Sequence, residues 1–230
     1  PILPAFFRWA EYPIYLFFRW IIGNFNECWI PDFSHPEMNL TGSLSHRFRL
    51  PSNVKFIGIL SRFRAPENES ARNHLYDVVV VISGPPPHSE ILANLILKQS
   101  KASTKKILII SGFLSIPIQN AHSNVTIVKH LEIHAFRDAL IHAKIVVCRA
   151  GYSGIMDLIA LKRTAYIIPT PGQTEQQYLG KYLGQQSLFR LTDQNQLELN
   201  QLSVIPEDGK TEWLNQILSM QEELPEITLK

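Results

Sequence analysis

Cysteine is scarce in this chain of 230 residues, with Cys28 and Cys148 far apart. Two such cysteines cannot form the framework of a disulfide-stapled secreted domain, so we expect both to be reduced thiols in a cytosolic protein. The formal net charge is only +2, and no block of lysine and arginine is long enough to neutralise several consecutive phosphates. A nucleic acid is therefore not an expected partner.

Several common catalytic motifs are also missing. The sequence contains no Walker A phosphate loop, no Gly-x-Gly-x-x-Gly pattern and no Gly-x-Ser-x-Gly nucleophile turn. Its eight histidines show no metal-ligand spacing with carboxylates or cysteines. These absences argue against a P-loop nucleotidase, a NAD-dependent enzyme and a serine hydrolase, and we predict neither a metal site nor a cofactor.

Long apolar runs are absent too. The longest, residues 13–23, contains Arg19 and is shorter than the about 20 apolar residues that span a bilayer. No basic region followed by an apolar core marks a signal peptide. The chain opens at Pro1, inside an expected element, and we expect it to be a fragment of a longer protein.

The sequence does contain an N-terminal segment rich in aromatic residues. Residues 5–22 predict a helix that Pro13 kinks or splits, with aromatic side chains on more than one face. A polar, proline-containing stretch at residues 62–73 suits a linker or hinge. Between them, turn residues separate three short extended pieces, at residues 27–31, 40–44 and 54–60.

After residue 76 the pattern changes to alternating strands and helices. Apolar, often β-branched runs predict six strands, at residues 78–82, 106–110, 125–128, 145–148, 165–168 and 188–191. Helical patterns lie between or after them, at residues 89–99, 133–142, 153–161, 174–183 and 212–220. This alternation predicts an α/β fold, a Rossmann-like parallel sheet with helices on both faces.

The loops that leave these strands form the candidate site, because ligands of open parallel sheets bind outside the carboxyl ends of the strands. After the first strand, Ser83 and Gly84 precede three prolines. A glycine there lets the backbone approach a phosphate at the next helix N-terminus, but the prolines remove backbone donors. A rigid strand-to-helix turn explains this loop equally well.

The loop after the fourth strand is more informative, because Arg149, Gly151 and Ser153 lead from a strand into a helix. Gly151 and Ser153 can present N–H and hydroxyl donors to a diphosphate, and we expect Ser153 to be the helix N-cap. Asp157 follows one turn later, where its carboxylate can accept hydrogen bonds from two ribose hydroxyls. The alternative is that Asp157 only complements the helix dipole.

Two further loops complete the candidate site. Val128 and Lys129, which leave the third strand, either flank a base or cover the core. Prolines and a glycine at residues 169–172 lead into a helix that opens with polar side chains able to bind sugar hydroxyls, namely Gln173, Glu175, Gln176 and Gln177. A solvated helix face is the alternative for this last cluster.

Together these loops resemble the C-terminal domain of the family-28 glycosyltransferases of the GT-B fold, over residues 125–183. The strings are most similar to those of a MurG-like bacterial subgroup. Ala150 and Gly154 depart from the pattern, since the family usually carries a serine and a threonine there. The resemblance rests on Arg149-Ala150-Gly151, on Asp157, and on Pro169-Thr170-Pro171-Gly172 followed by Gln176-Gln177.

The resemblance implies a role for the central site residues. Gly151 and Ser153 would hold the diphosphate of a UDP-sugar. Asp157 would bind the ribose diol, and Gln176 and Gln177 would bind the sugar hydroxyls.

It also implies a contribution from outside these loops. Residues 57–62 match the segment that links the two domains of the family, and Arg62 at its end would make a charge-assisted contact with the diphosphate. Val128 and Lys129 would lie beside the nucleobase. The remaining members of the predicted nucleotide-sugar-binding site are Ser83, Gly84, Arg149 and Gln173.

By the same resemblance, the chain would be a hexosyltransferase that moves a hexose or N-acetylhexosamine from a UDP-sugar to a lipid-linked or glycan acceptor, with inversion. Residues 1–62 would be a remnant of the N-terminal acceptor domain and the interdomain segment, and residues 63–230 the nucleotide-sugar-binding domain. The catalytic base would lie in the missing part, so none is assigned and the fragment alone is expected to be inactive. A nucleotide-sugar hydrolase or epimerase, and a non-catalytic binding module, are the alternatives.

The aromatic segment at residues 6–22 leaves two interpretations open. It is either a helix buried in the acceptor domain or an interfacial helix on a membrane, where a lipid-linked acceptor would be found. We therefore expect a cytoplasmic protein, and under the second interpretation one that contacts the inner face of the plasma membrane.

Overall fold

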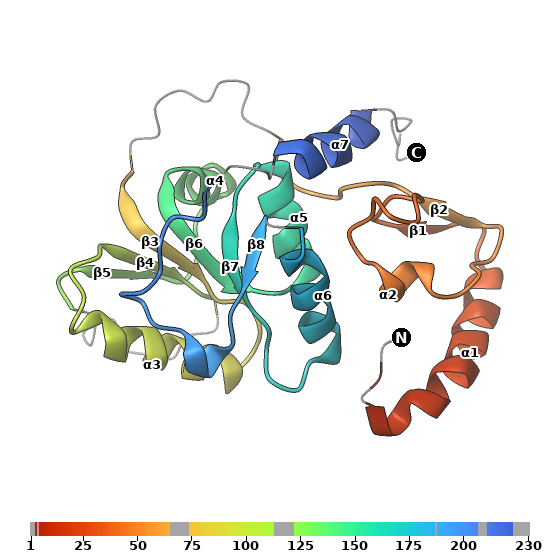
Figure 1. Ribbon diagram of the computed structural model, residues 1–230, viewed down its shortest axis with the longest axis horizontal. Helices are drawn as coiled ribbons and strands as arrows, with labels where there is room; N and C mark the ends of the chain where they lie inside the picture. The colour runs from red at the N-terminus through yellow and green to blue at the C-terminus, as the bar shows by residue number, and fades with distance from the viewer. Residues whose placement is uncertain are drawn as a thin grey trace.

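The computed structural model describes residues 3, 5–64, 74–112, 122–186, 188–206 and 211–222. Most of the predicted linker, residues 65–73, lies outside the described residues. A parallel sheet covered by helices makes up the larger part of the molecule, and the N-terminal elements lie to one side of it (Figure 1).

Six parallel strands form the main sheet, in the order β5-β4-β3-β6-β7-β8. All six predicted strands are present, with small shifts at their ends, and β4 and β7 are buried along their whole length. The predicted Rossmann-like parallel sheet is therefore confirmed. The strands are Tyr76–Val81 (β3), Ile107–Ile110 (β4), Val125–Val128 (β5), Ala143–Arg149 (β6), Ala165–Ile168 (β7) and Phe189–Leu191 (β8).

Helices cover both faces of this sheet, because successive side chains along each strand point to opposite sides. Val78 and Val80 pack in the core beneath α3, whereas Val79 packs in the core formed with α4, α5, α6 and α7. The sequence did not predict the short 3-10 helix η3. The helices are His88–Ser100 (α3), Ile133–Ile141 (α4), Tyr152–Ala160 (α5), Thr174–Gly184 (α6), Gln194–Gln196 (η3) and Thr211–Glu222 (α7).

The predicted N-terminal helix is split, as expected, but not at the proline. A 3-10 helix, η1 (Ala5–Ala10), changes directly into α1 (Glu11–Gly23). Pro13 lies in the first turn of α1, where a helix needs no backbone N–H and the proline ring meets no preceding carbonyl of the same helix. Proline therefore begins the α-helix here instead of interrupting it.

Extended structure at residues 40–44 is a prediction that the structure contradicts. The other two extended pieces form β1 (Cys28–Ile30) and β2 (Val54–Phe56), which pair in parallel, whereas α2 (Ser43–His46) begins inside the third piece. The N–H groups of Leu40 and Thr41 donate to the Asp32 carboxylate and not to a neighbouring strand. The Asp32 side chain thus accepts the hydrogen bonds that a neighbouring strand would have accepted if this segment were extended.

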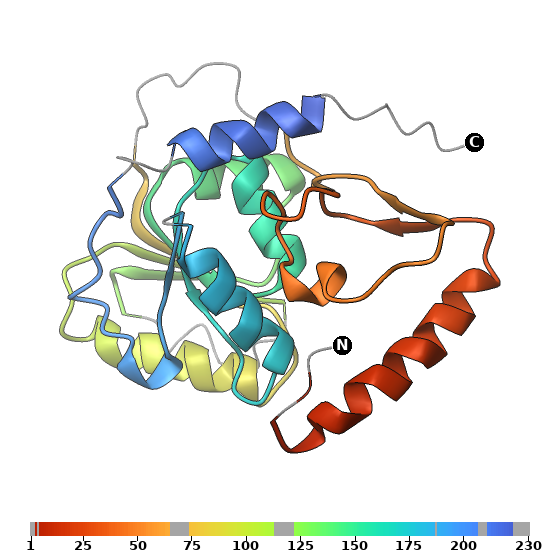
Figure 2. The same ribbon diagram turned by 45° about the vertical axis from the view of Figure 1, so that its right-hand side comes forward.

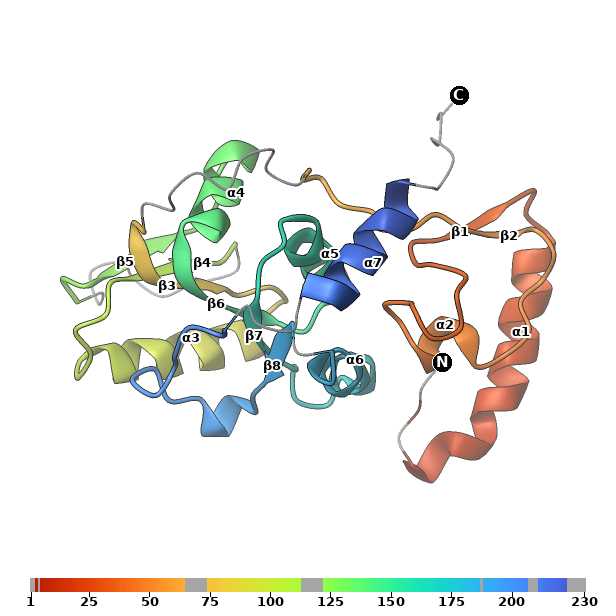
Figure 3. The same cartoon turned by 45° about the horizontal axis from the view of Figure 1, so that its top comes forward.

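The segment that follows β1 packs against the helices of the main sheet (Figure 3). Phe33 and Leu40 are buried in the same core as Ile155 of α5. Near the end of α7, the Gln221 side-chain oxygen accepts a hydrogen bond from the Ile59 N–H, so α7 returns to the segment that leaves β2. A boundary between two domains at residue 62 stays a prediction.

Helix α1 lies at the edge of the molecule away from the main sheet (Figure 2). Its large apolar side chains are exposed, as are those of η1, with Phe6 at 81% and Trp20 at 68%. None of the described helices has both the length and the apolar character that crossing a bilayer requires. Whether this helix lies on a membrane or against further protein stays a prediction.

The structure of the main sheet predicts that replacing a buried isoleucine lowers the free energy of unfolding much more than replacing an exposed one. Ile109→Ala, at a fully buried position of β4, should lower the free energy of unfolding by about 2–5 kcal/mol, because it leaves a cavity between packed layers. Ile91→Ala, at an exposed position of α3, is the matched control and should change it by less than about 1 kcal/mol. Urea unfolding followed by circular dichroism measures both, and equal losses would contradict the assignment of the core.

Candidate functional site

The strand order reverses at the centre of the main sheet. The chain runs from β3 outward to β4 and β5, then returns to form β6 on the other side of β3. Ligands of open parallel sheets bind in the crevice that such a reversal leaves at the carboxyl ends of the strands. A cavity of about 360 Å³ lies here, walled by β3, β6, α4, α5 and the Arg62 side chain.

Half of the predicted site residues line this cavity. The residues that line it are Arg62, Ser83, Arg149, Gly151, Ser153 and Asp157. The residues that do not are Gly84, Val128, Lys129, Gln173, Gln176 and Gln177. The cavity is therefore built mainly on the loop after β6, and the loops after β5 and β7 lie outside its lining.

The Asp157 carboxylate is the anionic group of the cavity. It lies in α5, nearly buried, and one of its oxygens accepts a hydrogen bond from the Ser61 hydroxyl at 2.7 Å. The other oxygen accepts a bond from Arg62 Nε at 3.2 Å. Because each carboxylate oxygen has two lone-pair positions, each can accept one further hydrogen bond from a ligand.

Arg62 reaches the cavity from the segment that follows β2. Its guanidinium lies over the rings of Phe63 and Phe136, with 5.1 and 4.8 Å to the ring centroids. Such cation–π contacts hold the guanidinium plane while leaving its edges free to donate. Only its Nε donates to a described residue, Asp157, so the terminal N–H groups are available to an anion.

The N-terminus of α5 borders the same cavity. Gly151 is its N-cap, with an extended backbone (φ −80°, ψ 135°), and the helix begins at Tyr152. Ser153 is therefore the second residue of the helix, and its prediction as the N-cap is wrong, because the extended conformation of β6 continues through Gly151. The N–H groups of this first turn have no partner within the helix and can donate to an anion.

Arg149 lines the cavity, but its guanidinium lies on the other face of the sheet. Val146 and Cys148 line the cavity, and the alternation of side chains along β6 places Arg149 on the side of α3. There its Nη2 donates to the His88 carbonyl at 2.7 Å and to Gln194 Oε1 at 2.8 Å. Burial lowers the pKa of Arg149 to about 10. The guanidinium thus joins α3 to η3.

The loop after β7 is stabilised by a glutamine that was expected to bind sugar. Gln176 Oε1 accepts a hydrogen bond from the Thr170 N–H at 2.9 Å, and its amide nitrogen donates to Gln173 Oε1. Gly172 adopts a φ of +83°, which this turn requires and which glycine tolerates. Gln177 is exposed at the start of α6. These contacts order the turn next to the cavity.

The loops after β3 and β5 differ in their distance from the cavity. Ser83 lines it, and Gly84 turns the chain away with a φ of +95°. Val128 ends β5, the edge strand, which β4 separates from β3. Since neighbouring strands are about 4.8 Å apart, Val128 and the exposed Lys129 lie about two strand spacings from the switch point.

Several residues of the cavity lining had no predicted role, and two of them, Phe136 and Tyr152, make contacts that shape the site. Phe136 of α4 supports Arg62, and its place depends on how α4 packs, which no local motif indicates. Tyr152 lines the cavity and donates its hydroxyl to the Pro31 carbonyl. Burial, and secondarily the charge of Asp32, raise the pKa of Tyr152. In the part of the chain that the structure describes, no three His, Cys, Asp or Glu side chains are grouped to hold a metal ion.

Comparison with known sequences finds one family. The sequence model of the glycosyltransferase family 28 C-terminal domain matches residues 78–216. The match begins in β3 and ends in α7, so it includes the main sheet and the loops that line the cavity. No curated protein sequence matches the chain.

Solved glycosyltransferase structures are similar in fold. The glycotransferase of kitacinnamycin has a TM-score of 0.60 at 12% identity, with 96% of this chain and 64% of that chain covered. The calicheamicin glycosyltransferase CalG4 has a TM-score of 0.57 at 14% identity, with 93% of this chain and 56% of that chain covered. The chain thus spans less than two thirds of each, and at these identities the similarity concerns the fold alone.

MurG itself is a weaker structural match. The Acinetobacter baumannii enzyme has a TM-score of 0.42 at 18% identity, with 67% of this chain and 43% of that chain covered. A similarity of this size does not decide the MurG-like subgroup, which stays a prediction.

The two cysteines should differ in reactivity. Burial raises the pKa of the Cys148 thiol to about 12, whereas Cys28 is only half-buried. Because the thiolate is the nucleophile, iodoacetamide at about pH 8 should alkylate Cys28 in the folded protein and Cys148 only after denaturation. Peptide mass spectrometry measures both sites, and similar labelling rates in the folded protein would show that the floor of the cavity is open.

Proposed function

The chain belongs to the family of glycosyltransferase family 28 C-terminal domains, and from this premise we propose that it transfers a hexose or N-acetylhexosamine from a UDP-sugar, with inversion. The cavity at the ends of β3 and β6 is the proposed donor site. The observation that carries this proposal is that a carboxylate, Asp157, and a guanidinium, Arg62, meet beside the N-terminus of α5 in one cavity.

This set of groups suits the chemistry of a nucleoside diphosphate. A diphosphate needs N–H donors and positive charge, which the first turn of α5, the Ser153 hydroxyl and the terminal nitrogens of Arg62 can supply. A ribose diol needs an acceptor, and each oxygen of Asp157 can take one hydroxyl beside its present donor. Groups that suit both requirements line the same cavity.

The same groups would assist departure of UDP. As the bond between the sugar and the diphosphate breaks, negative charge grows on the diphosphate, and donors already in position stabilise that charge most. The Phe63 and Phe136 rings hold the Arg62 guanidinium in place before the ligand arrives. In this proposal Arg62 therefore contributes to the rate as well as to binding.

The residues proposed to contact the nucleobase and the sugar lie outside the lining of the cavity. We place the base toward the loop after β5, with Val128 and Lys129, and the sugar toward the start of α6, with Gln176 and Gln177. Because Gln176 already binds the backbone of Thr170, its contact with a sugar hydroxyl would use its amide N–H or follow a rearrangement of the turn. Ser83, Gly84, Arg149 and Gln173 belong to the proposed site as the residues that shape its loops.

For the acceptor we propose a lipid-linked sugar or a glycan, met at a membrane surface by η1 and α1. The exposed aromatic side chains of these helices, Phe6 and Trp9 among them, suit the interfacial region of a bilayer. Their one acidic residue, Glu11, is buried and paired with Arg47, which leaves Arg8 as an exposed positive charge. This surface would place the protein at the cytoplasmic face of a membrane.

The donor site predicts a loss of nucleotide binding on removal of one carboxylate. Asp157→Ala should raise the dissociation constant for UDP about ten- to a hundredfold, because hydrogen bonds to a charged group contribute about 1.5–3 kcal/mol. Isothermal titration calorimetry measures this dissociation constant. Asp138→Ala, an exposed carboxylate on α4, is the matched control and should leave UDP affinity unchanged.

Two further variants separate the possible causes of this loss. Ser61→Ala removes a partner of Asp157 but no proposed ligand contact, so it should weaken UDP binding much less than Asp157→Ala. Undiminished affinity in Asp157→Ala would remove the ribose assignment. A native chain that binds no UDP would overturn the donor class as a whole.

The membrane surface predicts binding to anionic vesicles. The double variant Phe6→Ser, Trp9→Ser should lower the vesicle-bound fraction, since each large apolar side chain contributes about 1.5–3 kcal/mol when buried. Sedimentation with phosphatidylcholine vesicles, with and without phosphatidylglycerol, measures it. Val204→Ser, an exposed apolar residue on another part of the surface, is the control. Arg19 is unsuitable for charge reversal because it holds the Arg49 carbonyl.

A further inference from the structure

A second cavity lies beside α1, and we call it the α1 cavity. It has a volume of about 290 Å³, with α1 on one side and β1, α2 and residues 48–51 on the other (Figure 3). None of the described residues lines both this cavity and the one at the ends of β3 and β6. The binding of a UDP-sugar therefore leaves the α1 cavity without an assigned role.

One side of α1 faces this cavity. Tyr15, Phe18, Arg19 and Ile22 line it, and their spacing places them on the same face of a helix. Phe18 is also 50% exposed, so it belongs both to the lining and to the exposed aromatic surface of η1 and α1. The cavity is thus continuous with the surface that we propose to meet a membrane.

Contacts within the chain hold the α1 wall of the cavity in place. The Tyr15 hydroxyl donates to the Arg49 carbonyl at 2.7 Å, and the Tyr15 ring stacks on Phe48 with 4.6 Å between centroids. Two turns further along the helix, the Asn53 side-chain amide donates to the Ile22 carbonyl at 2.8 Å. These contacts attach α1 to the segment between α2 and β2.

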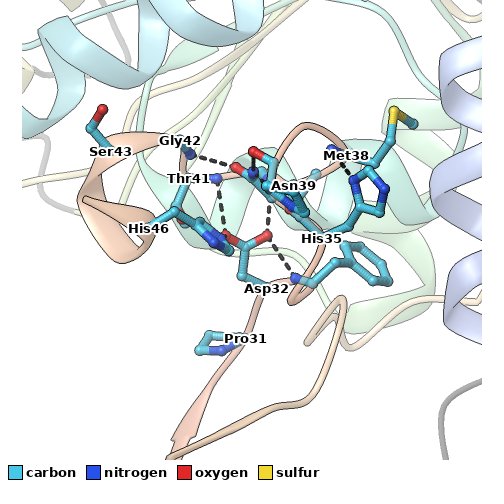
Figure 4. Close-up of polar contacts among 12 residues, drawn as sticks. Pro31, Asp32, His35, Met38, Asn39, Thr41, Gly42, Ser43 and His46 are labelled. Atoms are coloured by element: carbon cyan, nitrogen blue, oxygen red, sulfur yellow. Dashed lines mark hydrogen bonds and ion pairs between the residues drawn. The ribbon is translucent and has the colours of Figure 1, made fainter. Parts of the chain in front are cut away.

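The opposite wall includes α2, which the Asp32 carboxylate orders. The Thr41 N–H, just before α2, donates to this carboxylate at 3.2 Å, and His46 Nε2, at the end of α2, lies 3.1 Å from it (Figure 4). The His46 ring stacks on Phe56 of β2 with 5.1 Å between centroids. Since contacts within the chain hold both walls, the cavity is formed before any ligand arrives, as most ligand sites are.

The lining of the α1 cavity is apolar apart from one cation. Arg19 is the only charged residue among the described residues that line it. Its Nη1 donates to the Tyr15 hydroxyl and to the Arg49 carbonyl, both at 2.9 Å, whereas its Nε and Nη2 have no partner among the residues that the structure describes. These groups can donate to an anion. The cavity therefore suits a hydrocarbon chain that carries an anionic group at one end.

The exposed aromatic surface indicates where such a ligand would come from. Trp9 and Trp20 are exposed on η1 and α1, and aromatic side chains of this kind suit the interfacial region of a bilayer. The molecule with apolar chains and an anionic head that a bilayer supplies is a phospholipid. A cavity of about 290 Å³ lies at the lower end of the about 300–1,000 Å³ of ligand cavities, so it has room for one chain and not for a whole two-chain lipid.

We propose that the α1 cavity binds one acyl chain of an anionic phospholipid, with the lipid phosphate on Arg19; this inference rests on the proposed contact of η1 and α1 with a membrane. The second chain of the same lipid stays in the bilayer. Burial of the first chain removes apolar surface of Phe18 and Ile22 from water, which favours binding. The bound lipid then keeps α1 on the membrane.

The first test uses a lipid that is free in solution, dodecanoyl-lysophosphatidylglycerol below its critical micelle concentration. The native chain should bind it, as measured by isothermal titration calorimetry. Ile22→Trp fills the cavity from α1 and should weaken binding about tenfold or more, the loss expected when about two methylene groups are displaced. Leu16→Trp adds the same side chain to the exposed side of α1 and should leave the affinity unchanged. Equal affinities of the two variants would overturn the proposal.

The second test separates the contributions of the chain and the head. Glycerol 3-phosphate, which has the head without the chain, should not bind, and monododecanoylglycerol, which lacks the phosphate, should bind the native chain less tightly than the lysolipid. Arg19→Gln should weaken binding of the lysolipid about tenfold and leave that of monododecanoylglycerol unchanged, while Arg19→Lys should retain most of the affinity. In both variants Tyr15 still holds the Arg49 carbonyl. A preference for the phosphate that survives Arg19→Gln contradicts the assignment of Arg19.

Sedimentation with anionic vesicles separates this inference from the proposed membrane surface. A native chain that sediments with no vesicles loses the membrane surface, and the phospholipid falls with it as the occupant. A native chain that sediments with vesicles, while Ile22→Trp and Leu16→Trp bind the free lipid equally, retains the membrane surface and loses only the site in the cavity. A native chain that binds no lipid, but forms a dimer in size-exclusion chromatography that Ile22→Trp abolishes, would replace the phospholipid by a second copy of the chain and so overturn the proposal.

Discussion

A parallel strand exposes side chains on two faces, so each strand of the main sheet has to be covered on both sides before it is stable. In this chain the crossover helices α3, α4, α5 and α6 provide that cover, and each returns the chain to the same edge of the sheet. All the carboxyl ends of the strands therefore lie together. The reversal between β3 and β6 leaves the cavity at that edge, and the position of the site is thus a consequence of burying the sheet.

One buried carboxylate, Asp157, attaches the N-terminal elements to this framework, and a second, Asp32, orders the loop that packs on it. Asp157 accepts from Ser61 and Arg62, and Asp32 accepts from its own loop and from His46. A buried carboxylate is stable only where donors surround it, so both contacts specify geometry more than they add stability. The apolar core shared by Phe33, Leu40 and α5 supplies the attraction, and the bonds of Ser61 and Arg62 to Asp157 orient the segment after β2 on α5.

Much of the main sheet could be predicted from the sequence because its signals are local. Apolar runs mark the strands, and the alternation along β6 is enough to place Arg149 on the α3 side once the strand is known. The contacts that complete the site are not local. Ser61 and Asp157 are 96 residues apart, and Asp32 reaches His46 across 14 residues with no periodic pattern between them. The prediction of extended structure at residues 40–44 was wrong for the same reason, because the hydrogen-bond partner of Leu40 and Thr41 is the distant Asp32 side chain and not a strand.

The hydrogen bond from Ile59 to Gln221 bears on how the two parts of the chain can move. The segment that leaves β2 is joined to the main-sheet part by the covalent chain after residue 64 and, separately, by this contact at the far end of α7. Together with the bonds of Ser61 and Arg62 to Asp157 and of Tyr152 to Pro31, this contact holds the N-terminal elements at several separate points, so that they have no single axis about which to turn as a body.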